Sequence, residues 1–149
     1  MTTKEALLTH CKSFVDKRLQ TVEAIISDNQ KALQSETKSS AGDKHETGRA
    51  MLQLEMEKAG QQLAGINLMK ATLAKINIDK TSTIAHLGSI VFTEKVNYFL
   101  SISAGKLTIE NDDFFAVSVF SPIGRLLLGK QENDRVLFKN TEIKIIKID

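Results

Sequence analysis

Apolar residues recur at alternating intervals of four and three residues along the first stretch of the chain, from Lys4 to about Glu36. No Gly or Pro interrupts this stretch, and its charged residues lie mostly off the apolar line. Such spacing is typical of a helix that buries one narrow seam against a partner helix, as in a coiled coil. The seam positions are Leu8, Val15, Leu19, Val22, Ile26, Asn29 and Leu33.

A second stretch, from about Asp43 to Ile76, repeats the helical pattern and carries a polar face beside its apolar line. Each stretch has about 30 residues, which is roughly 45 Å of helix at 1.5 Å per residue. Two such helices predict an antiparallel hairpin, in which Asn29 fixes the register of pairing at some cost in stability. Gly60 and Gly65 lie inside the second helix, where their small size is expected to let the partner helix approach closely.

The pattern changes after about residue 83, where short runs alternate apolar with polar residues and turn residues separate the runs. The expected strands are 89–93, 98–102, 106–109, 115–120, 136–138 and 142–148. A short helix is expected between the strands at 115–120 and 136–138. Ser121 is typical of a helix N-cap, Pro122 of the first helical position, and Gly129 of a helix end. The sequence therefore predicts an α+β protein. It has an antiparallel coiled-coil hairpin over 1–78 and a small antiparallel β-sheet domain with one short helix over 84–149.

Composition narrows the functional classes. A net charge of +2, from 20 basic and 18 acidic residues, creates no strong field toward nucleic acid or anionic membrane. The single cysteine, Cys11, excludes an internal disulfide and fits a reducing compartment. No apolar run approaches the ~20 residues of a membrane span, so we expect a cytoplasmic protein without a membrane partner. A phosphate-binding loop is absent, because Gln131 follows Gly129-Lys130 where Ser or Thr is needed, and no small-molecule substrate is expected.

The polar break at residues 39–47, which we call the acidic tip, contains Asp43 and Glu46. If the second helix begins at about Asp43, these two carboxylates lie side by side. Asp followed three residues later by Glu is also the capping pattern that starts a helix, and the two interpretations do not exclude one another. Two carboxylates can supply the one or two protein oxygens of a Mg²⁺ shared with substrate phosphates. Water, phosphate or another protein would have to supply the remaining ligands.

Three cations surround the acidic tip, namely Lys38, Lys44 and Arg49. They are typical of a solvated charged end of a helical hairpin. The same cations can also guide a phosphate backbone past the carboxylates, which would make them RNA-guiding residues.

Three features together resemble the Gre family of bacterial transcript-cleavage factors. The segment 121–130, SPIGRLLLGK, followed by Asn-Asp-Arg-Val at 133–136, is similar to the family's Ser-Pro-(Leu/Ile)-Gly-x-x-Leu-Leu-Gly-Lys and Gly-Asp-x-Val. The residues GDKHE at 42–46 resemble the family's tip, Gly-Asp-x-x-Glu. Gly60 and Gly65 occur at a spacing similar to that in the family's second coiled-coil helix.

The resemblance implies an FKBP-like fold for 84–149, without prolyl isomerase activity, and docking of this domain on RNA polymerase at the rim of the secondary channel. The hairpin then reaches the active centre, where Asp43 and Glu46 help hold a second Mg²⁺ that activates water against backtracked RNA. The protein would be a cofactor of the polymerase nuclease and no enzyme itself, and it would meet nascent RNA and template DNA in the elongation complex. The expected partner-binding residues are Ser121, Pro122, Gly124, Arg125, Gly129 and Lys130.

The chain departs from the family after Glu46. Thr47-Gly48-Arg49-Ala50 stands where the family usually has Asn-Ala followed by an acidic and an aromatic residue. Gly48 in the first turn is expected to loosen the helix start, which affects cleavage more than polymerase binding. Two alternatives therefore stay open: a regulator that binds the same channel without stimulating cleavage, and a coiled-coil scaffold with no polymerase role whose tip is only a capped turn.

Overall fold

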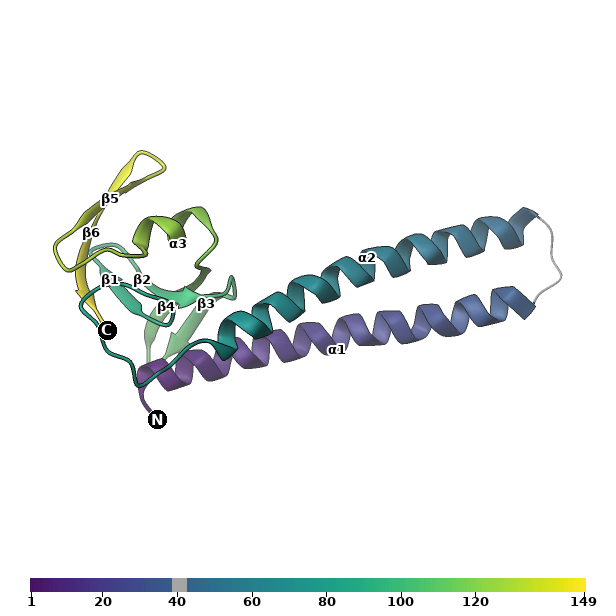
Figure 1. Cartoon of the computed structure of the whole chain (residues 1–149), viewed down its shortest axis with the longest axis horizontal. Coiled ribbons are helices and arrows are strands. Elements are labelled where there is room, and N and C mark those ends of the chain that lie inside the picture. Colours follow the sequence, from purple (N-terminus) through teal and green to yellow (C-terminus); the bar gives the residue numbers. More distant parts are fainter. Residues whose placement is uncertain (39–42) are drawn as a thin grey trace. The chain divides into compact units, whose positions relative to one another are not determined.

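The computed structural model describes residues 1–38 and 43–149, and the side chains of residues 1–35 and 47–149. Two long helices are followed by a six-stranded sheet, with a short helix between its fourth and fifth strands (Figure 1). The predicted α+β class is confirmed. The elements are α1 (Thr3–Lys38), α2 (Asp43–Ala74), β1 (Ile90–Thr93), β2 (Asn97–Ser101), β3 (Gly105–Ile109), β4 (Asp112–Ser118), α3 (Pro122–Leu127), β5 (Arg135–Phe138) and β6 (Thr141–Ile148).

The chain divides into two compact units, and each is described by itself. The sheet unit comprises residues 1–14 and 70–149, and the hairpin unit comprises residues 15–69. The predicted limits 1–78 and 84–149 follow the change from helices to strands and stay a prediction. None of the helices in the described part of the chain is long and apolar enough to cross a membrane.

In the hairpin unit, α1 and α2 run in opposite directions (Figure 1). Burial along both helices repeats every seven residues, as the seam predicts. Val15, Val22 and Asn29 are buried in α1, and Ala59 and Ile66 are buried in α2. Because α1 and α2 are the only elements among the described residues of this unit, the buried lines mark where the two helices pack.

Gly60 and Gly65 do not lie at this helix interface. Both are exposed, and a Cβ built on either glycine would meet no atom within 4 Å. The expectation that they let the partner helix approach closely is wrong. The residues of α2 that pack at the interface are their neighbours Ala59 and Ile66. Because successive residues are about 100° apart around a helix, Gly60 and Gly65 point away from the interface.

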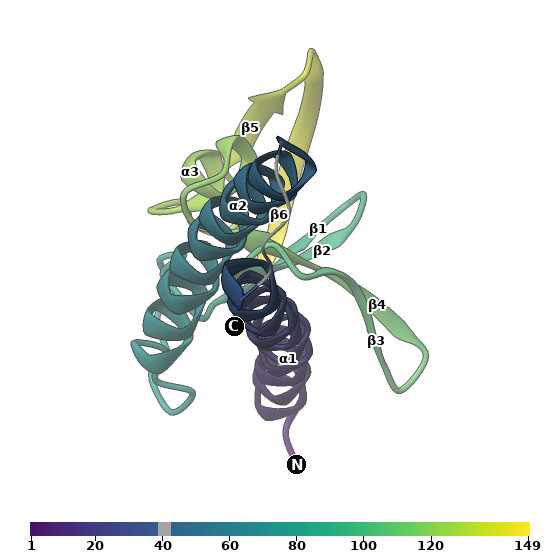
Figure 2. The same cartoon turned by 90° about the vertical axis from the view of Figure 1, so that its right-hand side faces the viewer.

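The strand order in the sheet is β3-β4-β2-β1-β6-β5. The prediction of an antiparallel sheet holds for every pairing except β2 with β4, which run parallel in register from Asn97↔Phe114 to Ser101↔Ser118. β3 and β4 form a hairpin, visible at the right in Figure 2, and β4 lies between β3 and β2. The parallel pairing of β2 with β4 is therefore the part of the topology that differs from the prediction.

The core of the sheet unit lies between the sheet and α3. Ile123 and Leu127 are four residues apart on one face of α3, and both are buried against residues of the sheet. The first turns of α1 belong to the same unit, where Leu7 and Cys11 are fully buried and the Cys11 Sγ lies 3.7 Å from the Ser101 Oγ. The buried cluster around α3 consists of Ala85, Val91, Leu100, Ile123, Leu127, Val136, Ile143 and Ile145.

Candidate functional site

The acidic tip, residues 39–47, follows the last residue of α1, Lys38, and includes the start of α2 at Asp43. The predicted start of the second helix at about Asp43 is thus confirmed. Asp43 and Glu46 both fall in the first turn of α2, and residues three apart in a helix share one side of it. Their side chains lie outside the described residues, so their paired role stays a prediction. The N-terminus of a helix carries a partial positive charge that favours ionised carboxylates.

The expected RNA-guiding cations are placed by the same two helix ends. Lys38 ends α1 and Lys44 follows Asp43 in α2, and the side chains of both lie outside the described residues. Arg49 is described and is exposed on α2. α2 continues without a break through Gly48, so the helix that carries these residues is continuous from Asp43 to Ala74.

Ser121 and Gly124 hold the start of α3. The Ser121 Oγ accepts a hydrogen bond from the Gly124 N–H at 3.1 Å and donates one to the Ser118 carbonyl oxygen at 2.6 Å. Pro122 occupies the first turn of the helix, as predicted. Gly124 is buried, and a Cβ at this position would clash with the Ser118 carbonyl oxygen. Ser121 and Gly124 therefore have a local structural reason to be Ser and Gly.

Gly129 and Lys130 hold the end of α3 through their backbones. The Gly129 N–H donates to the Ala85 carbonyl oxygen and the Ala85 N–H donates to the Lys130 carbonyl oxygen, both at 2.8 Å. Gly129 has a φ of +80°, a conformation that glycine adopts without steric cost. The sequence motif at 121–130 thus fixes a helix and its two ends, as predicted, while the backbone pairing with Ala85 was not foreseen from the sequence.

The side chains of this motif that reach solvent are fewer than the predicted partner-binding set. Pro122 and Arg125 are exposed, and Ser121 and Lys130 are partly exposed. Sequence reasoning missed Phe120, which was assigned to a strand but precedes the N-cap and is 57% exposed. Exposed aromatic and arginine side chains are enriched at protein–protein interfaces. We call Phe120, Pro122 and Arg125 the α3 patch.

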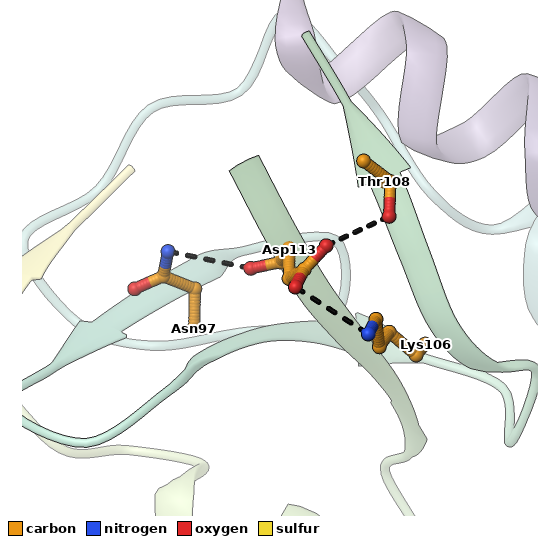
Figure 3. Close-up of polar contacts among 4 residues, drawn as sticks. All are labelled: Asn97, Lys106, Thr108 and Asp113. Atoms are coloured by element: carbon orange, nitrogen blue, oxygen red, sulfur yellow. Dashed lines mark hydrogen bonds and ion pairs between the residues drawn. The ribbon is translucent and has the colours of Figure 1, made fainter. Parts of the chain in front are cut away.

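A polar cluster that the sequence did not reveal lies on the β3–β4 hairpin (Figure 3). The Thr108 hydroxyl donates to the Asp113 carboxylate at 2.7 Å, and the Lys106 Nζ lies 3.5 Å from the other carboxylate oxygen. The Thr108 hydrogen bond, together with the Lys106 charge, holds the pKa of Asp113 below its usual value. Asp113 was expected between the strands 106–109 and 115–120 but lies in β4, because the turn is formed by Glu110 and Asn111 with positive φ.

Ser89 and His86 form a contact that resembles a nucleophile and its base, since the Ser89 Oγ lies 2.8 Å from the His86 Nδ1. Ser89 is fully buried, so no substrate reaches its hydroxyl. The same hydroxyl accepts a hydrogen bond from the His86 backbone N–H at 2.9 Å. The pair therefore shapes the chain before β1 and has no access for catalysis.

The acidic tip is the candidate position for a metal ion, as the sequence predicts. Among the residues that the structure describes, no three His, Cys, Asp or Glu side chains come together to hold a metal ion. Mg²⁺ commonly takes one or two protein carboxylates and completes its octahedron with water and substrate phosphate. The donor types of Asp43 and Glu46, placed in one helical turn, fit an ion shared in this way.

Comparisons with known proteins give a distant structural likeness. No protein-family model matches the chain, and no significant match is found among curated proteins. A solved structure described as that of the transcription factor Gfh1 aligns with 90% of this chain and 92% of its own, at 19% sequence identity and a TM-score of 0.34. Because the identity and the TM-score are both low, function is argued below from the residues and their geometry.

Proposed function

We propose that this protein is a transcription elongation factor that enters the secondary channel of RNA polymerase and stimulates the polymerase's own cleavage of backtracked RNA. One observation supports the proposal most strongly. α1 continues unbroken to Lys38 and α2 begins at Asp43, so the Gly-Asp-x-x-Glu motif lies where a helical pair turns. The cytoplasm, where transcription occurs in bacteria, is the proposed location.

The dimensions of the hairpin unit suit a narrow channel. From Val15 to Lys38, α1 rises about 35 Å at 1.5 Å per residue. A single helix with its side chains is about 10–12 Å across, so a pair is a slender rod. Such a rod can bring two carboxylates to a reaction centre that belongs to another protein.

In this proposal, Asp43 and Glu46 hold a Mg²⁺ that the polymerase and the transcript share. When bound, that ion supplies charge stabilisation and activation of water in two-metal phosphodiester hydrolysis. The chain's own contribution is to present two ionised carboxylates on one side of a helix N-terminus. Lys38, Lys44 and Arg49 attract the phosphate backbone toward them. The protein is a cofactor of the polymerase nuclease in this proposal and no enzyme itself.

The sheet unit is proposed to dock on the polymerase through the α3 patch. Pro122 and Arg125 are exposed there, and Lys130 is partly exposed at the other end of α3. Ser121, Gly124 and Gly129 act indirectly, because their hydrogen bonds and backbone geometry hold α3 in place.

A cleavage assay tests the proposal. A stalled, backtracked elongation complex is incubated with Mg²⁺ and the protein, and short 3′ RNA fragments are measured. Asp43→Asn and Glu46→Gln are expected to lower the cleavage rate at least about tenfold, as loss of metal-site groups commonly does. The matched control is Asp28→Asn, which removes an exposed carboxylate from α1 and should leave cleavage unchanged. Polymerase binding is measured separately for each variant.

The possible results separate the three functions. Fragments that depend on Asp43 and Glu46, with binding intact in the variants, support the cleavage factor. Polymerase binding without fragments refutes it and leaves the channel-binding regulator. No polymerase binding at all leaves a coiled-coil scaffold.

A further inference from the structure

Apolar packing between the two helices of the hairpin unit stops before the helices end. Val15 and Val22 of α1, and Ala59 and Ile66 of α2, are each at most 5% exposed. They recur every seven residues, so both helices contribute buried apolar side chains to this part of the seam. We call residues 15–22 and 59–66 the base of the hairpin.

Toward the acidic tip, the buried apolar residues are missing. We call residues 23–35 of α1 and 48–58 of α2 the distal part of the hairpin, and Asn29 is the one buried residue in these two ranges. The apolar residues at seam spacing are only partly buried here, namely Ile26, Leu33, Leu52 and Met56. The distal part therefore has no layer of buried apolar side chains like those of the base.

Asn29 occupies the position of the next layer in the seam. A step of seven residues from Val22 toward the tip gives Asn29, and the same step from Ala59 gives Leu52. Asn29 is 7% exposed, and its Nδ2 has no hydrogen-bond partner among the described residues. This N–H group can bind water when the helices separate, so its burial destabilises the packed state. The Asn29–Leu52 layer thus favours separation of the helices, whereas the layers of the base oppose it.

The remaining apolar side chains of the distal part contribute little to its packing. Ile25 is 39% exposed, Met51 is 61% exposed and Leu54 is 65% exposed. Helices of about 12–15 residues are only marginally stable in water when nothing packs against them. The parts of α1 and α2 beyond the base are each close to this length. Once separated, these two helix ends would not protect their backbone amides from solvent.

We propose that the distal part of the hairpin opens as a local unit at the Asn29–Leu52 layer, while the base stays packed. Opening separates residues 23–35 of α1 from residues 48–58 of α2. Regions with few buried apolar contacts open at a lower free energy than the core of the same protein. The polar layer therefore divides the hairpin into a firmly packed base and a distal part that opens and closes.

This opening gives the proposed function a means of adjustment, and that consequence rests on the proposed function. The helix ends that carry Asp43 and Glu46 can change their separation without loss of packing in the base. A partner that binds both helix ends favours the closed state, because it contacts that state better than the open one.

Amide hydrogen exchange of the full chain, followed residue by residue by NMR, tests the opening without polymerase. In the wild type, protection at 26–35 and 50–58 should be at least about tenfold lower than at 15–22 and 59–66. Asn29→Leu should slow exchange at 50–58 at least about fivefold, because an apolar side chain replaces the unpaired amide in the seam. Since the substitution lies in α1 and the effect is read in α2, the result reports on the pairing of the helices.

Ser27→Leu is the matched control. Ser27 is exposed and off the seam, and serine and asparagine have similar helix propensities. This variant should exchange at 50–58 like the wild type. Equal protection of the distal part and the base, unchanged exchange at 50–58 in Asn29→Leu, or the same slowing in Ser27→Leu would each overturn the proposal. None of these results involves RNA cleavage, so the proposed function would be unaffected by them.

Discussion

Gly124→Ala is expected to destabilise the sheet unit by about 3 kcal/mol, at the upper end of the cost of overpacking a core. The added methyl would clash with the Ser118 carbonyl oxygen and lie 2.9 Å from its carbonyl carbon and 3.0 Å from the Val119 Cα. These neighbours are backbone atoms, which cannot rotate away as a flexible side chain does. The Ser118 carbonyl is also held by the Ser121 N–H at 3.1 Å and the Ser121 hydroxyl at 2.6 Å.

The magnitude follows from what must be lost when α3 moves. Two hydrogen bonds to the Ser118 carbonyl contribute about 1 kcal/mol each. Displacing α3 also loosens Ile123, which is 8% exposed, and Leu127, which is fully buried, in the core. Reduced packing of two such side chains adds about 1 kcal/mol or more.

Urea unfolding followed by the fluorescence of Tyr98 measures this loss. Tyr98 is the single tyrosine and is partly buried in β2, so it reports on the sheet unit. Gly60→Ala is the matched control, since the same added methyl meets no atom within 4 Å and should not lower the unfolding free energy reported by Tyr98. An unfolding free energy of Gly124→Ala within about 0.5 kcal/mol of the wild type would refute the reasoning.

Three further predictions concern the helices. Gly60→Ala should stabilise α2 by about 0.5–1 kcal/mol in thermal unfolding followed by far-UV circular dichroism, because alanine has the higher helix propensity; a loss would show a close neighbour over Gly60. Asn29→Leu should stabilise the hairpin by about 1–2 kcal/mol in urea unfolding, because the buried Nδ2 of Asn29 has no hydrogen-bond partner among the described residues. A lower stability of the variant than of the wild type would contradict this prediction. Burial raises the pKa of Cys11 from 9.0 to about 11, opposed by the Ser101 hydrogen bond. The neutral thiol therefore favours the folded state below pH 9.0, and the wild type should lose roughly 2–3 kcal/mol relative to Cys11→Ala as the pH rises to about 11; parallel pH profiles would contradict it.

The helices could be predicted from the sequence because their periodicity and their burial have the same cause. Val15 and Val22 recur at seam positions, and the structure buries them at the same interval. The cap at Ser121 was also predictable, since a hydroxyl before a proline satisfies the free N–H groups of a helix start. Helix capping of this kind involves residues close together in the sequence, so it can be recognised without knowing the fold.

The sheet topology was less predictable because the sequence of a strand does not specify which other strands pair with it. Alternation located β2 and β4, but their parallel pairing depends on how the β3–β4 hairpin folds back. The connection between the strands expected at 106–109 and 115–120 was predicted too long, because Glu110 takes a positive φ and Asp113 accepts a hydrogen bond from Thr108 across the hairpin. Both outcomes depend on contacts between segments that are separate in the sequence.

The residue types of the candidate site were predictable, and the roles of the α3 motif were not. Asp43 and Glu46 were found from their spacing, and the position of Asp43 at the helix start is confirmed, while their paired role stays a prediction. The clash that excludes a side chain at Gly124 involves the Ser118 backbone, and Gly129 is fixed by Ala85. Such requirements appear only when distant segments are packed together.

The most direct test of the central claim is photo-crosslinking of the hairpin end to RNA inside a backtracked elongation complex. The photoreactive residue p-benzoylphenylalanine replaces Thr47, the last residue of the acidic tip, or Leu137, which is 65% exposed on β5. The account predicts a crosslink from position 47 to the 3′ end of the transcript and none from position 137. A crosslink to RNA from position 137, with none from position 47, would contradict it.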